Sequence, residues 1–338
     1  MNLKDGKYSR YKLVREMMQT PEVIRRFDPQ AAQAFVPALK ASGRLFLTGE
    51  GSSRIFPAKR AIYDALKKAD ALSIATDGAT QALEYDLAAY TVFGASNSGK
   101  TKEVVRLFQA LKSSGHRALF ALTAYEDSPL DRLATDSHIL ISGKEEAVAA
   151  TKTVVEQALF YDSLLRALRG EETEGLKDLA DKVEQALTAA IDPGLVERAK
   201  NAPMIYFAGR NTGVAEELTL KTNEITRKKA DFLEGTYAVH GIEEVMDGEE
   251  LVVVVEPFPS EEEKFRECLI DGVGLEVIAL SMRKTSFPTV EIPEAGEYQS
   301  YVEIAAGWNL LVEIGVGLGI DLDKPERARK VGNIYRGT

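Results

Sequence analysis

The 338-residue chain contains a single cysteine, Cys268. One cysteine excludes an intramolecular disulfide and is typical of a reducing compartment, so we expect a cytoplasmic protein. No histidine follows Cys268 in the sequence, and the surrounding stretch EKFRECLIDG is typical of a helix face. We therefore expect a buried, inert thiol at this position rather than a nucleophile.

The chain also lacks a block of basic residues and a long apolar run. Its 42 Lys and Arg residues are outnumbered by 52 Asp and Glu residues, and the net charge of -10 argues against nucleic acid or an anionic membrane as a partner. No segment approaches the ~20 apolar residues of a membrane span, and the first residues, MNLKDGKYSRYK, lack the apolar core of a signal peptide. We expect a protein that is neither exported nor membrane-inserted and that binds a small soluble molecule.

Short apolar runs alternate with helical stretches along most of the chain, which is typical of parallel sheets with crossover helices. The length and the hydrophobic fraction of 45% favour two domains over one. The predicted strands are 44–51, 71–76, 90–96, 118–123 and 137–142 in the first half, and 204–210, 251–257, 276–281 and 289–293 in the second half.

Helical patterns lie between these runs. Residues 54–69, 101–115 and 213–229 are predicted helices, with Gly115 as a C-terminal cap. The charged stretch 169–194 is predicted to be a helical linker that ends at Pro193 and Gly194, and residues 11–27 an amphipathic helix broken at Thr20–Pro21. Two similar α/β domains in tandem are therefore expected.

Two hydroxyl-rich loops follow predicted strands of the first half. GEGSSR (49–54) follows the first strand, and SNSGKT (96–101) follows the third. From Gly94 the second loop fits G-x-x-x-x-G-K-[ST], the pattern of nucleotide-binding loops. A nucleotide hydrolase would also need a second strand that ends in an acidic residue, and the strand 118–123 reaches Glu126 and Asp127 only after a turn. Hydroxyls and backbone amides at strand ends favour a different phosphate, held without a metal, although any one serine could instead cap a helix.

Seven segments, in order and spacing, resemble those of the sugar isomerase (SIS) family, specifically two-SIS-domain proteins related to the isomerase half of glutamine-fructose-6-phosphate aminotransferase. The segments are MMQTPEVIRR (17–26), GEGSS (49–53), SNSGKT (96–101), EEAVAATK (145–152), FAGR with AEELTLKTNEI (207–225), AVHG (238–241) and DLDKPERARKV (321–331). In this comparison the nucleotide-loop pattern is a coincidence, created by Lys100 where the family usually has Glu or Asn.

The resemblance implies an α/β fold of two tandem SIS domains, each a parallel sheet flanked by helices in a flavodoxin-like αβα sandwich. The implied boundaries are a helical segment at 1–30, SIS domains at 31–170 and 195–323, a helical linker at 171–194 and a C-terminal tail at 324–338.

The resemblance also implies the site residues. The substrate phosphate would bind Ser52, Ser53, Ser96, Asn97, Ser98 and Thr101. Gly51, Val148 and Ala150 would contact the sugar. The catalytic groups would be Lys221, Glu224, His240 and Lys330. His240 would enter the site from the neighbouring subunit of a homodimer. No metal and no cofactor are implied, and the partner is a small sugar phosphate.

These residue types suit proton transfer between C1 and C2 of an open-chain sugar. Glu224 could remove and return a carbon-bound proton, and His240 could protonate the ring oxygen as the ring opens. Lys330 could form a Schiff base with the carbonyl, and Lys221 could stabilise an oxyanion. Lys221 and Glu224 lie three residues apart and share a helix face, so a solvated ion pair is the plain alternative. His116 and His138 are expected to be surface residues.

Several differences from the family pattern leave the substrate open. Ala150 replaces a Ser, Ile242 replaces a Pro, and Asn97 shortens a Gln. No glutaminase domain precedes the first half, so we expect that the chain does not make ammonia from glutamine. An aldose-ketose isomerase or a hexosamine 6-phosphate deaminase is the first hypothesis. A deglycase of 6-phosphorylated Amadori compounds and a non-catalytic sugar-phosphate sensor stay open.

Overall fold

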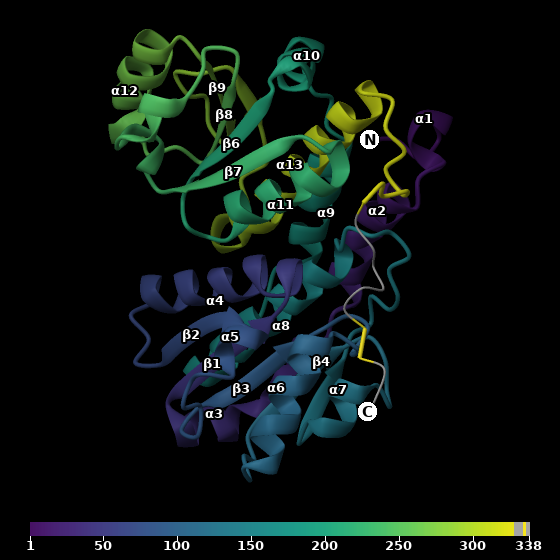
Figure 1. The fold of residues 1–338 in the computed structure, drawn as a ribbon. Coiled ribbons are helices and arrows are strands. Elements are labelled where there is room, and N and C mark those ends of the chain that lie inside the picture. Colours follow the sequence, from purple (N-terminus) through teal and green to yellow (C-terminus); the bar gives the residue numbers. More distant parts are fainter. Residues whose placement is uncertain (328–333, 336–338) are drawn as a thin grey trace. The chain divides into compact units, whose positions relative to one another are not determined.

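The computed structural model describes residues 1–327, 334 and 335 of the chain. It contains two five-stranded sheets in which every strand pair is parallel, with helices flanking each sheet (Figure 1). The α/β fold expected from the alternating apolar runs is therefore confirmed.

The two sheets have the same strand order. The first sheet contains β1 (Arg44–Gly49), β2 (Ser73–Gly78), β3 (Thr91–Ala95), β4 (Leu119–Thr123) and β5 (Asp136–Ile139) in the order β2-β1-β3-β4-β5. The second contains β6 (Met204–Gly209), β7 (Lys229–Glu234), β8 (Leu251–Val255), β9 (Glu276–Ser281) and β10 (Thr289–Glu291) in the order β10-β9-β8-β6-β7. In each sheet the strand order reverses between the first and third strands along the chain. Ligands of such folds bind at this switch point.

Helices cover both faces of the sheets. The α-helices are α1 (Gly6–Ser9), α2 (Lys12–Arg26), α3 (Val36–Ser42), α4 (Ile55–Lys67), α5 (Ala79–Ala82), α6 (Lys102–Ser113), α7 (Pro129–Leu133), α8 (Lys152–Arg169), α9 (Leu176–Thr188), α10 (Pro193–Asn201), α11 (Val214–Thr226), α12 (Glu262–Phe265) and α13 (Gln299–Gly317). The shorter elements are the 3₁₀ turns η1 (Pro29–Phe35), η2 (Gly51–Ser53), η3 (Tyr237–Val239), η4 (Ile242–Val245), η5 (Pro259–Glu261) and η7 (Gly296–Tyr298), and the π-helix η6 (Arg266–Val273).

The chain divides into two compact units, each built around one sheet. The first-sheet unit contains Glu22–Glu146, Ala150–Leu176 and, near the chain end, the described residues Arg327, Ile334 and Tyr335. The second-sheet unit contains Met1–Pro21, Ala147–Ala149 and Lys177–Glu326. The domain boundaries stated above remain predictions.

The first sheet is buried on both faces. Val92 and Leu119 pack against α6 in one core cluster, together with Phe108 of that helix. On the other face, Phe93 lies 5.7 Å from Phe160 of α8, measured between ring centroids. Successive side chains of a strand point to opposite faces, so β3 serves both layers. Each fully buried phenylalanine contributes about 2–3 kcal/mol through the hydrophobic effect.

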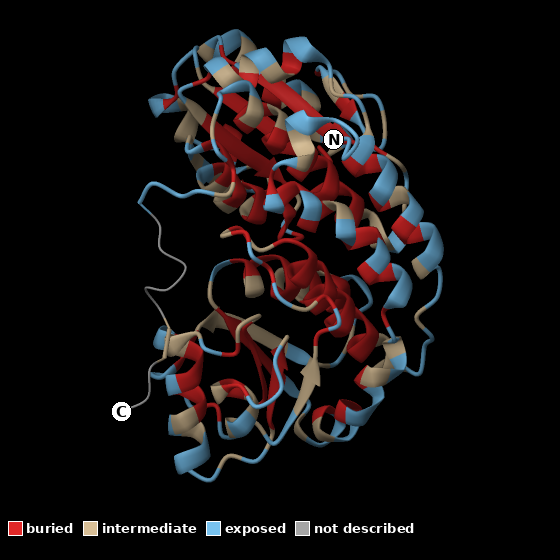
Figure 2. Ribbon diagram, turned by 90° about the vertical axis from the view of Figure 1, so that its right-hand side faces the viewer, coloured by how far each residue is buried: buried red, intermediate tan, exposed pale blue. Residues whose placement is uncertain are grey.

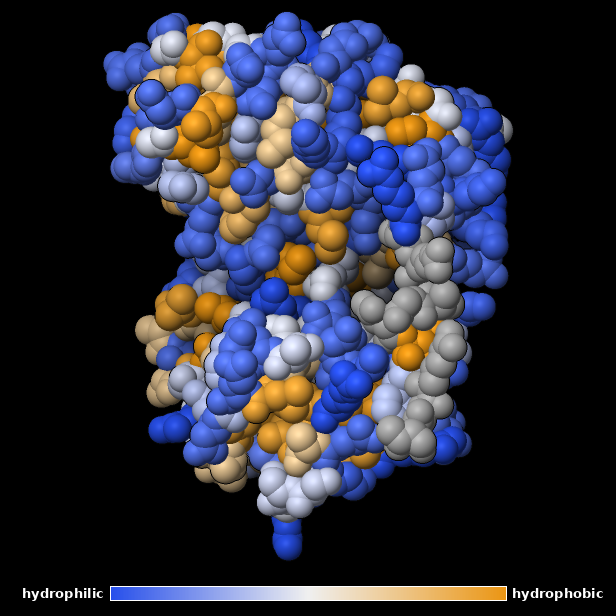
Figure 3. Space-filling view, in the orientation of Figure 1, coloured by the Kyte–Doolittle hydropathy of each residue, from blue (hydrophilic) through white to orange (hydrophobic). Residues whose placement is uncertain are grey.

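The second sheet is built in the same way. Val252 and Val254 of β8 pack with Phe265 and Leu269 on one face, where the half-buried Cys268 also lies. Central strands are drawn in the colour of buried residues, whereas several edge strands are half-buried or exposed (Figure 2). On the face drawn in Figure 3, hydrophilic side chains predominate and hydrophobic ones form scattered groups. No helix in the described part of the chain is both long and apolar enough to cross a membrane.

Three local expectations are wrong. The helix predicted over 213–229 ends at Thr226, because Arg227 takes a left-handed conformation (φ 57°), and β7 follows as an unpredicted edge strand. Helix α2 continues through Pro21 without a break. A proline inside a helix costs about 3 kcal/mol, which burial of apolar residues before and after Pro21 offsets. Finally, Pro193 begins α10 behind the cap Asp192 instead of ending a linker helix.

Candidate functional site

The two hydroxyl-rich loops lie side by side at the carboxyl edge of the first sheet. Strands β1 and β3 are neighbours, with Gly49 paired to Ala95 at the point where both strands end. η2 follows β1 directly, and the loop 96–101 follows β3. These loops therefore flank the reversal point of the sheet, and the amino terminus of α6 begins at the end of the second loop.

Hydroxyls and amides line the loop 96–101, which we call the hydroxyl loop. The hydroxyls of Ser96 and Thr101 lie 2.7 Å apart. The Oγ of Ser98 accepts a hydrogen bond from the amide of Lys100 at 3.2 Å. Asn97 donates from Nδ2 to the carbonyl of Gly143 at 3.0 Å, so its side chain is held by the segment after β5. The loop closes on itself through its own hydroxyls, and the Ser98 side chain is only half-buried.

Gly94 and Gly99, the two glycines of the nucleotide-loop pattern, are each required by local packing. A Cβ at Gly94 would lie 2.6 Å from the ring of Phe108, so this glycine lets α6 pack against β3. Gly99 has φ +60°, and a Cβ there would lie 2.1 Å from the Oγ of Ser128. Glycine is the residue that takes this backbone conformation at low cost. Packing explains both glycines without a bound nucleotide.

The residues expected to contact the sugar lie on two segments. Gly51, Ser52 and Ser53 form η2, in which Ser52 is buried. Val148 and Ala150 are half-buried in the irregular segment before α8. Val148 groups with the second-sheet unit and Ala150 with the first-sheet unit.

A buried carboxylate that was not among the predicted site residues, although it begins the segment EEAVAATK, shapes the end of this segment. Glu145 accepts hydrogen bonds from the amide of Thr151 at 2.7 Å, from its hydroxyl at 2.8 Å, and from the hydroxyl of Thr153. These bonds satisfy groups at the start of α8 that have no partner within the helix. A separation of six residues matches neither the helix nor the strand period. The pairing of Glu145 with Thr151 is therefore visible only in the fold.

Helix α11 carries the charged cluster of the second-sheet unit. The ammonium of Lys221 lies 2.7 Å from the carboxylate of Glu224 and 3.2 Å from that of Glu217. Lys221 and Glu217 are fully buried, whereas the side chain of Glu224 is 26% exposed. The spacing 217, 221 and 224 puts all three on one helix face, so this spacing could have identified Glu217.

Two opposing effects set the charge state of Lys221. Burial lowers its pKa, but the carboxylates of Glu224 and Glu217 outweigh burial, so the pKa is raised above the ordinary value of 10.5. Lys221 is therefore a fixed cation and not a proton acceptor near neutral pH. It holds one oxygen of Glu224 in place, while the Glu224 side chain stays partly exposed.

The remaining predicted catalytic residues are not joined to this cluster by a described contact. His240 is exposed at the end of η3, and its Nε2 lies 3.4 Å from the Nζ of Lys264. Lys330 lies outside the described residues. The structure thus brings Lys221 together with Glu224, and Ser96 with Thr101.

The other two histidines are more buried than expected. His138 lies on β5, with its side chain 13% exposed and its ring stacked on Phe160 at 4.7 Å. The ring of His116 accepts from the amide of Ala118 at 3.2 Å, and its Nε2 lies 3.0 Å from the carbonyl of Leu87. Both are half-buried rather than exposed, because β5 and Phe160 partly cover His138 and the backbone contacts hold the ring of His116 in place.

A cleft of about 790 Å³ lies at the opposite, amino-terminal edge of the first sheet. Its lining includes Leu87, Tyr90 and His116, near the starts of β3 and β4. Both ring nitrogens of His116 already have backbone partners. Because ligands of parallel sheets bind at carboxyl ends, the hydroxyl loop remains the better candidate site.

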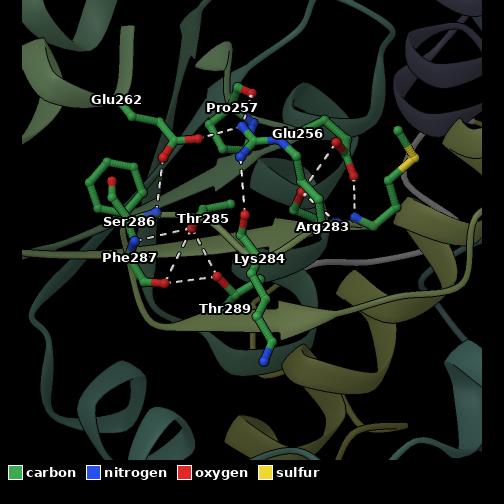
Figure 4. A network of polar contacts seen from close by, with 11 residues as sticks. Glu256, Pro257, Glu262, Arg283, Lys284, Thr285, Ser286, Phe287 and Thr289 are labelled. Carbon is green, nitrogen blue, oxygen red and sulfur yellow. Dashed lines mark hydrogen bonds and ion pairs between the residues drawn. The ribbon is translucent and has the colours of Figure 1, made fainter. Parts of the chain in front are cut away.

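At the corresponding edge of the second sheet, carboxylates take the place of hydroxyls. Glu256, directly after β8, accepts from the amide of Met282 at 2.5 Å and from the hydroxyl of Ser281 at 3.2 Å. Nearby, Arg283 pairs with Glu262, which also accepts from the amide of Ser286 at 2.9 Å (Figure 4). In this network the hydrogen-bond donors of Ser281, Met282, Arg283 and Ser286 are bound by the carboxylates of Glu256 and Glu262.

The comparisons with known proteins find a family match in the first half of the chain. Residues 87–167, which include the hydroxyl loop, match the family model described as SIS domain. The chain is 26% identical over 259 residues to glutamine–fructose-6-phosphate aminotransferase [isomerizing] of Halobacterium salinarum, covering 71% of this chain and 43% of the aminotransferase. The chain thus spans less than half the length of this curated relative.

Two solved structures share the fold over nearly the whole chain. Tagatose-6-phosphate ketose/aldose isomerase from Escherichia coli has a TM-score of 0.78 at 18% identity, covering 96% of this chain and 99% of that chain. Glucosamine-6-phosphate deaminase from Thermotoga maritima has a TM-score of 0.73 at 18% identity, with the same coverage of 96% and 99%. At this identity the likeness establishes the fold alone.

Proposed function

We propose that this chain processes a 6-phosphorylated sugar by moving a proton between C1 and C2, as an aldose-ketose isomerase or a hexosamine 6-phosphate deaminase. The observation that carries the proposal is the cluster of Glu217, Lys221 and Glu224 on α11. A buried ammonium between carboxylates is a costly way to stabilise a helix, because desolvation offsets most of the attraction. Clusters of this kind are found at functional sites, where they fix a reactive group.

The cluster suits a single proton-transfer role. Lys221 stays protonated and fixes the carboxylate of Glu224. Glu224 keeps part of its surface open, so it can reach a carbon-bound proton, remove it and return it to the adjacent carbon. Such a carboxylate acts first as a base and then as an acid.

We assign substrate phosphate binding to Ser96, Ser98 and Thr101 of the hydroxyl loop, with Asn97 and the η2 serines Ser52 and Ser53 as further ligands. A phosphate dianion accepts hydrogen bonds from hydroxyls and from amides at a helix amino terminus. Its binding energy positions the reacting carbons. Gly51, Val148 and Ala150 are proposed to contact the sugar.

The resemblance supplies the other proposed roles. His240 would open the sugar ring and would be donated by the second subunit of a homodimer, and Lys330 would act at the carbonyl carbon. The test of shared sites is complementation. Glu224→Gln and His240→Asn chains, each inactive alone, should regain part of the activity when they are unfolded together and refolded as mixed dimers. Mixed dimers without activity would contradict the shared site.

The test of the function itself is turnover on a panel of phosphosugars: fructose, tagatose and glucosamine 6-phosphates and fructoselysine 6-phosphate. Glu224→Gln should abolish turnover and leave binding within about threefold, since proton transfer contributes roughly 10²–10⁴-fold or more to the rate. Glu197→Gln is the matched control, because Glu197 also pairs with a lysine three residues away, Lys200 at 2.8 Å, but on an exposed helix. This control should keep full activity.

The outcomes of the panel separate the hypotheses. Turnover of fructoselysine 6-phosphate alone would favour the deglycase. Binding without turnover of any compound would contradict the enzyme and favour a sugar-phosphate sensor. A Glu224→Gln chain that keeps wild-type turnover would remove Glu224 from the mechanism.

A further inference from the structure

The end of the chain contacts the hydroxyl loop within the first-sheet unit. The amide of Tyr335 donates a hydrogen bond to the carbonyl of Lys100 at 2.8 Å. Its neighbour Ile334 forms an antiparallel bridge with Thr101. These two residues therefore extend along the last two residues of the loop, like a short added strand.

The side chain of Tyr335 fixes this position. Its ring packs against the core cluster between the first sheet and α6, which includes Val105. Its hydroxyl accepts a hydrogen bond from the Nε2 of Gln109 at 2.7 Å. Thr101, Val105 and Gln109 are spaced four residues apart and share one face of α6. Tyr335 is therefore held at the start of the helix by its backbone and two turns later by its hydroxyl.

The bond to Lys100 fixes the orientation of one peptide group. The carbonyl of Lys100 and the amide of Thr101 belong to the same planar, trans peptide, so they point in opposite directions. The carbonyl of Lys100 points toward Tyr335. The amide of Thr101 therefore points away from Tyr335. Among the described residues none accepts a hydrogen bond from this amide. Within the part of the chain that the structure describes, it is thus a donor without an acceptor at the amino terminus of α6.

We propose that Tyr335 is a positioning residue for phosphate binding, which orients the Thr101 amide as a donor to the bound phosphate. The inference rests on the proposed phosphate role of the hydroxyl loop. Without the Tyr335 side chain, the chain end loses its anchor on α6, and the backbone amide of residue 335 is no longer held against the Lys100 carbonyl. The Lys100–Thr101 peptide can then rotate. Binding then has to order this peptide, and the affinity for the anion falls.

Phosphate binding by calorimetry is the first test, with the full chain and with inorganic phosphate and fructose 6-phosphate as probes. Tyr335→Ala should weaken both affinities about tenfold, the effect of one charge-assisted hydrogen bond. Tyr335→Phe keeps the ring and should lose roughly threefold. Tyr63→Ala is the matched control, since it removes a half-buried tyrosine from α4 of the same unit, and it should bind as the wild type does.

The amide signal of Thr101 gives a readout that a general loss of stability would not produce. In ¹⁵N-labelled wild-type protein, titration with inorganic phosphate should shift this signal, and in Tyr335→Phe the shift should be smaller. Tyr335→Ala should also raise KM and leave kcat unchanged with a substrate that the wild type turns over. The wild-type titration needs no variant, so the inference stays testable if Tyr335→Ala lowers the melting temperature.

The failures of the two proposals differ. A wild-type chain that binds neither probe would contradict the phosphate role of the loop, and with it this inference. Phosphate binding that leaves the Thr101 signal unmoved, or equal affinity of the wild type and Tyr335→Ala, would overturn the role of Tyr335 alone.

Discussion

The loops after β3 and β8 hold corresponding places in sheets of the same strand order, yet their donors are used differently. After β3, hydroxyls of Ser96 and Thr101 bond each other, and the amide of Thr101 has no acceptor among the described residues. After β8, the carboxylate of Glu256 takes up the amide of Met282 and the hydroxyl of Ser281. We propose that the first loop accepts an anion, whereas the second already contains a carboxylate.

This difference shows that strand order creates a place for a ligand but does not determine whether a ligand binds there. In both sheets the strand order reverses between the first and third strands along the chain. The side chains that follow those strands decide whether the donors there are open or satisfied internally. A carboxylate also repels a second anion, so the loop after β8 is a poor phosphate site.

The largest expected loss of phosphosugar affinity comes from placing a carboxylate in the hydroxyl loop, as the loop after β8 has. Ser98→Glu adds a carboxylate to the hydroxyl loop at a half-buried position. Phosphosugar affinity should fall about a thousandfold, because like charges in contact cost several kcal/mol. Isothermal calorimetry with fructose 6-phosphate measures this loss. Ser260→Glu adds the same charge to the exposed η5 of the second-sheet unit and should leave the affinity unchanged. Equal losses would show that net charge, rather than the loop, matters.

Next in size is the backbone of the hydroxyl loop. Gly99→Ala forces a Cβ against Ser128 at a positive φ, which should lower the free energy of unfolding by about 3 kcal/mol and weaken phosphosugar binding. Gly115→Ala is the matched control, since Gly115 has φ +85° with nothing within 4 Å of the added Cβ. This control should cost about 1 kcal/mol. Urea denaturation compares the two, and equal losses would mean that the loop can shift to accept the methyl group.

A smaller loss is expected at the buried carboxylate of the second sheet. Glu256 has φ 45°, an unfavourable conformation for a residue with a side chain, and its hydrogen bonds to Met282 and Ser281 offset that cost. Glu256→Gln should destabilise the protein by about 2 kcal/mol in denaturant unfolding. Phosphosugar affinity should not change. A loss of affinity instead would contradict the separation of the two loops.

The smallest effect concerns pH. Burial raises the pKa of Glu262, but hydrogen bonds from Ser286 and the ion pair with Arg283 outweigh burial, so the pKa lies below its ordinary value of 4.5. The stabilisation is therefore present above pH 4.5 and is lost as the pH falls through the folded-state pKa.

Glu262→Gln should cost about 1 kcal/mol at pH 7, and the difference from the wild type should shrink in acid. Glu263→Gln, at the neighbouring position of α12, serves as the control for the loss of one carboxylate. Unfolding curves collected from pH 7 to pH 3 provide the measurement. A difference that stays constant over this range would contradict the depressed pKa.

The parts of the fold that the sequence predicted are those with a local pattern. β3 and β8 are continuous apolar runs, which is typical of strands buried on both faces. The edge strand β7 was missed because it mixes exposed charged residues with few apolar ones, and these charged residues follow a helix without a break in polarity. Pro21 was misread because local propensity favours a break, whereas burial along α2 maintains the helix.

The candidate site was predicted in outline for a similar reason. Lys221 and Glu224 share a helix face by their spacing alone, and the structure joins them by an ion pair. Full burial of Lys221 could not be foreseen, because it depends on elements distant in the sequence that pack over α11. Tyr335 had no motif at all, since its contacts to Lys100 and Gln109 join residues more than two hundred positions apart.

The sequence by itself determined the two sheets, the loops that end their central strands and the charges carried by α11, because apolar periodicity and residue spacing act over a few residues. The tertiary structure alone decided which donors stay open and which are satisfied. That choice depends on partners brought together from distant parts of the chain, such as Met282 at Glu256 and Tyr335 at Lys100. A hydrogen bond is made or missed according to distances of a few tenths of an ångström, which no short stretch of sequence specifies.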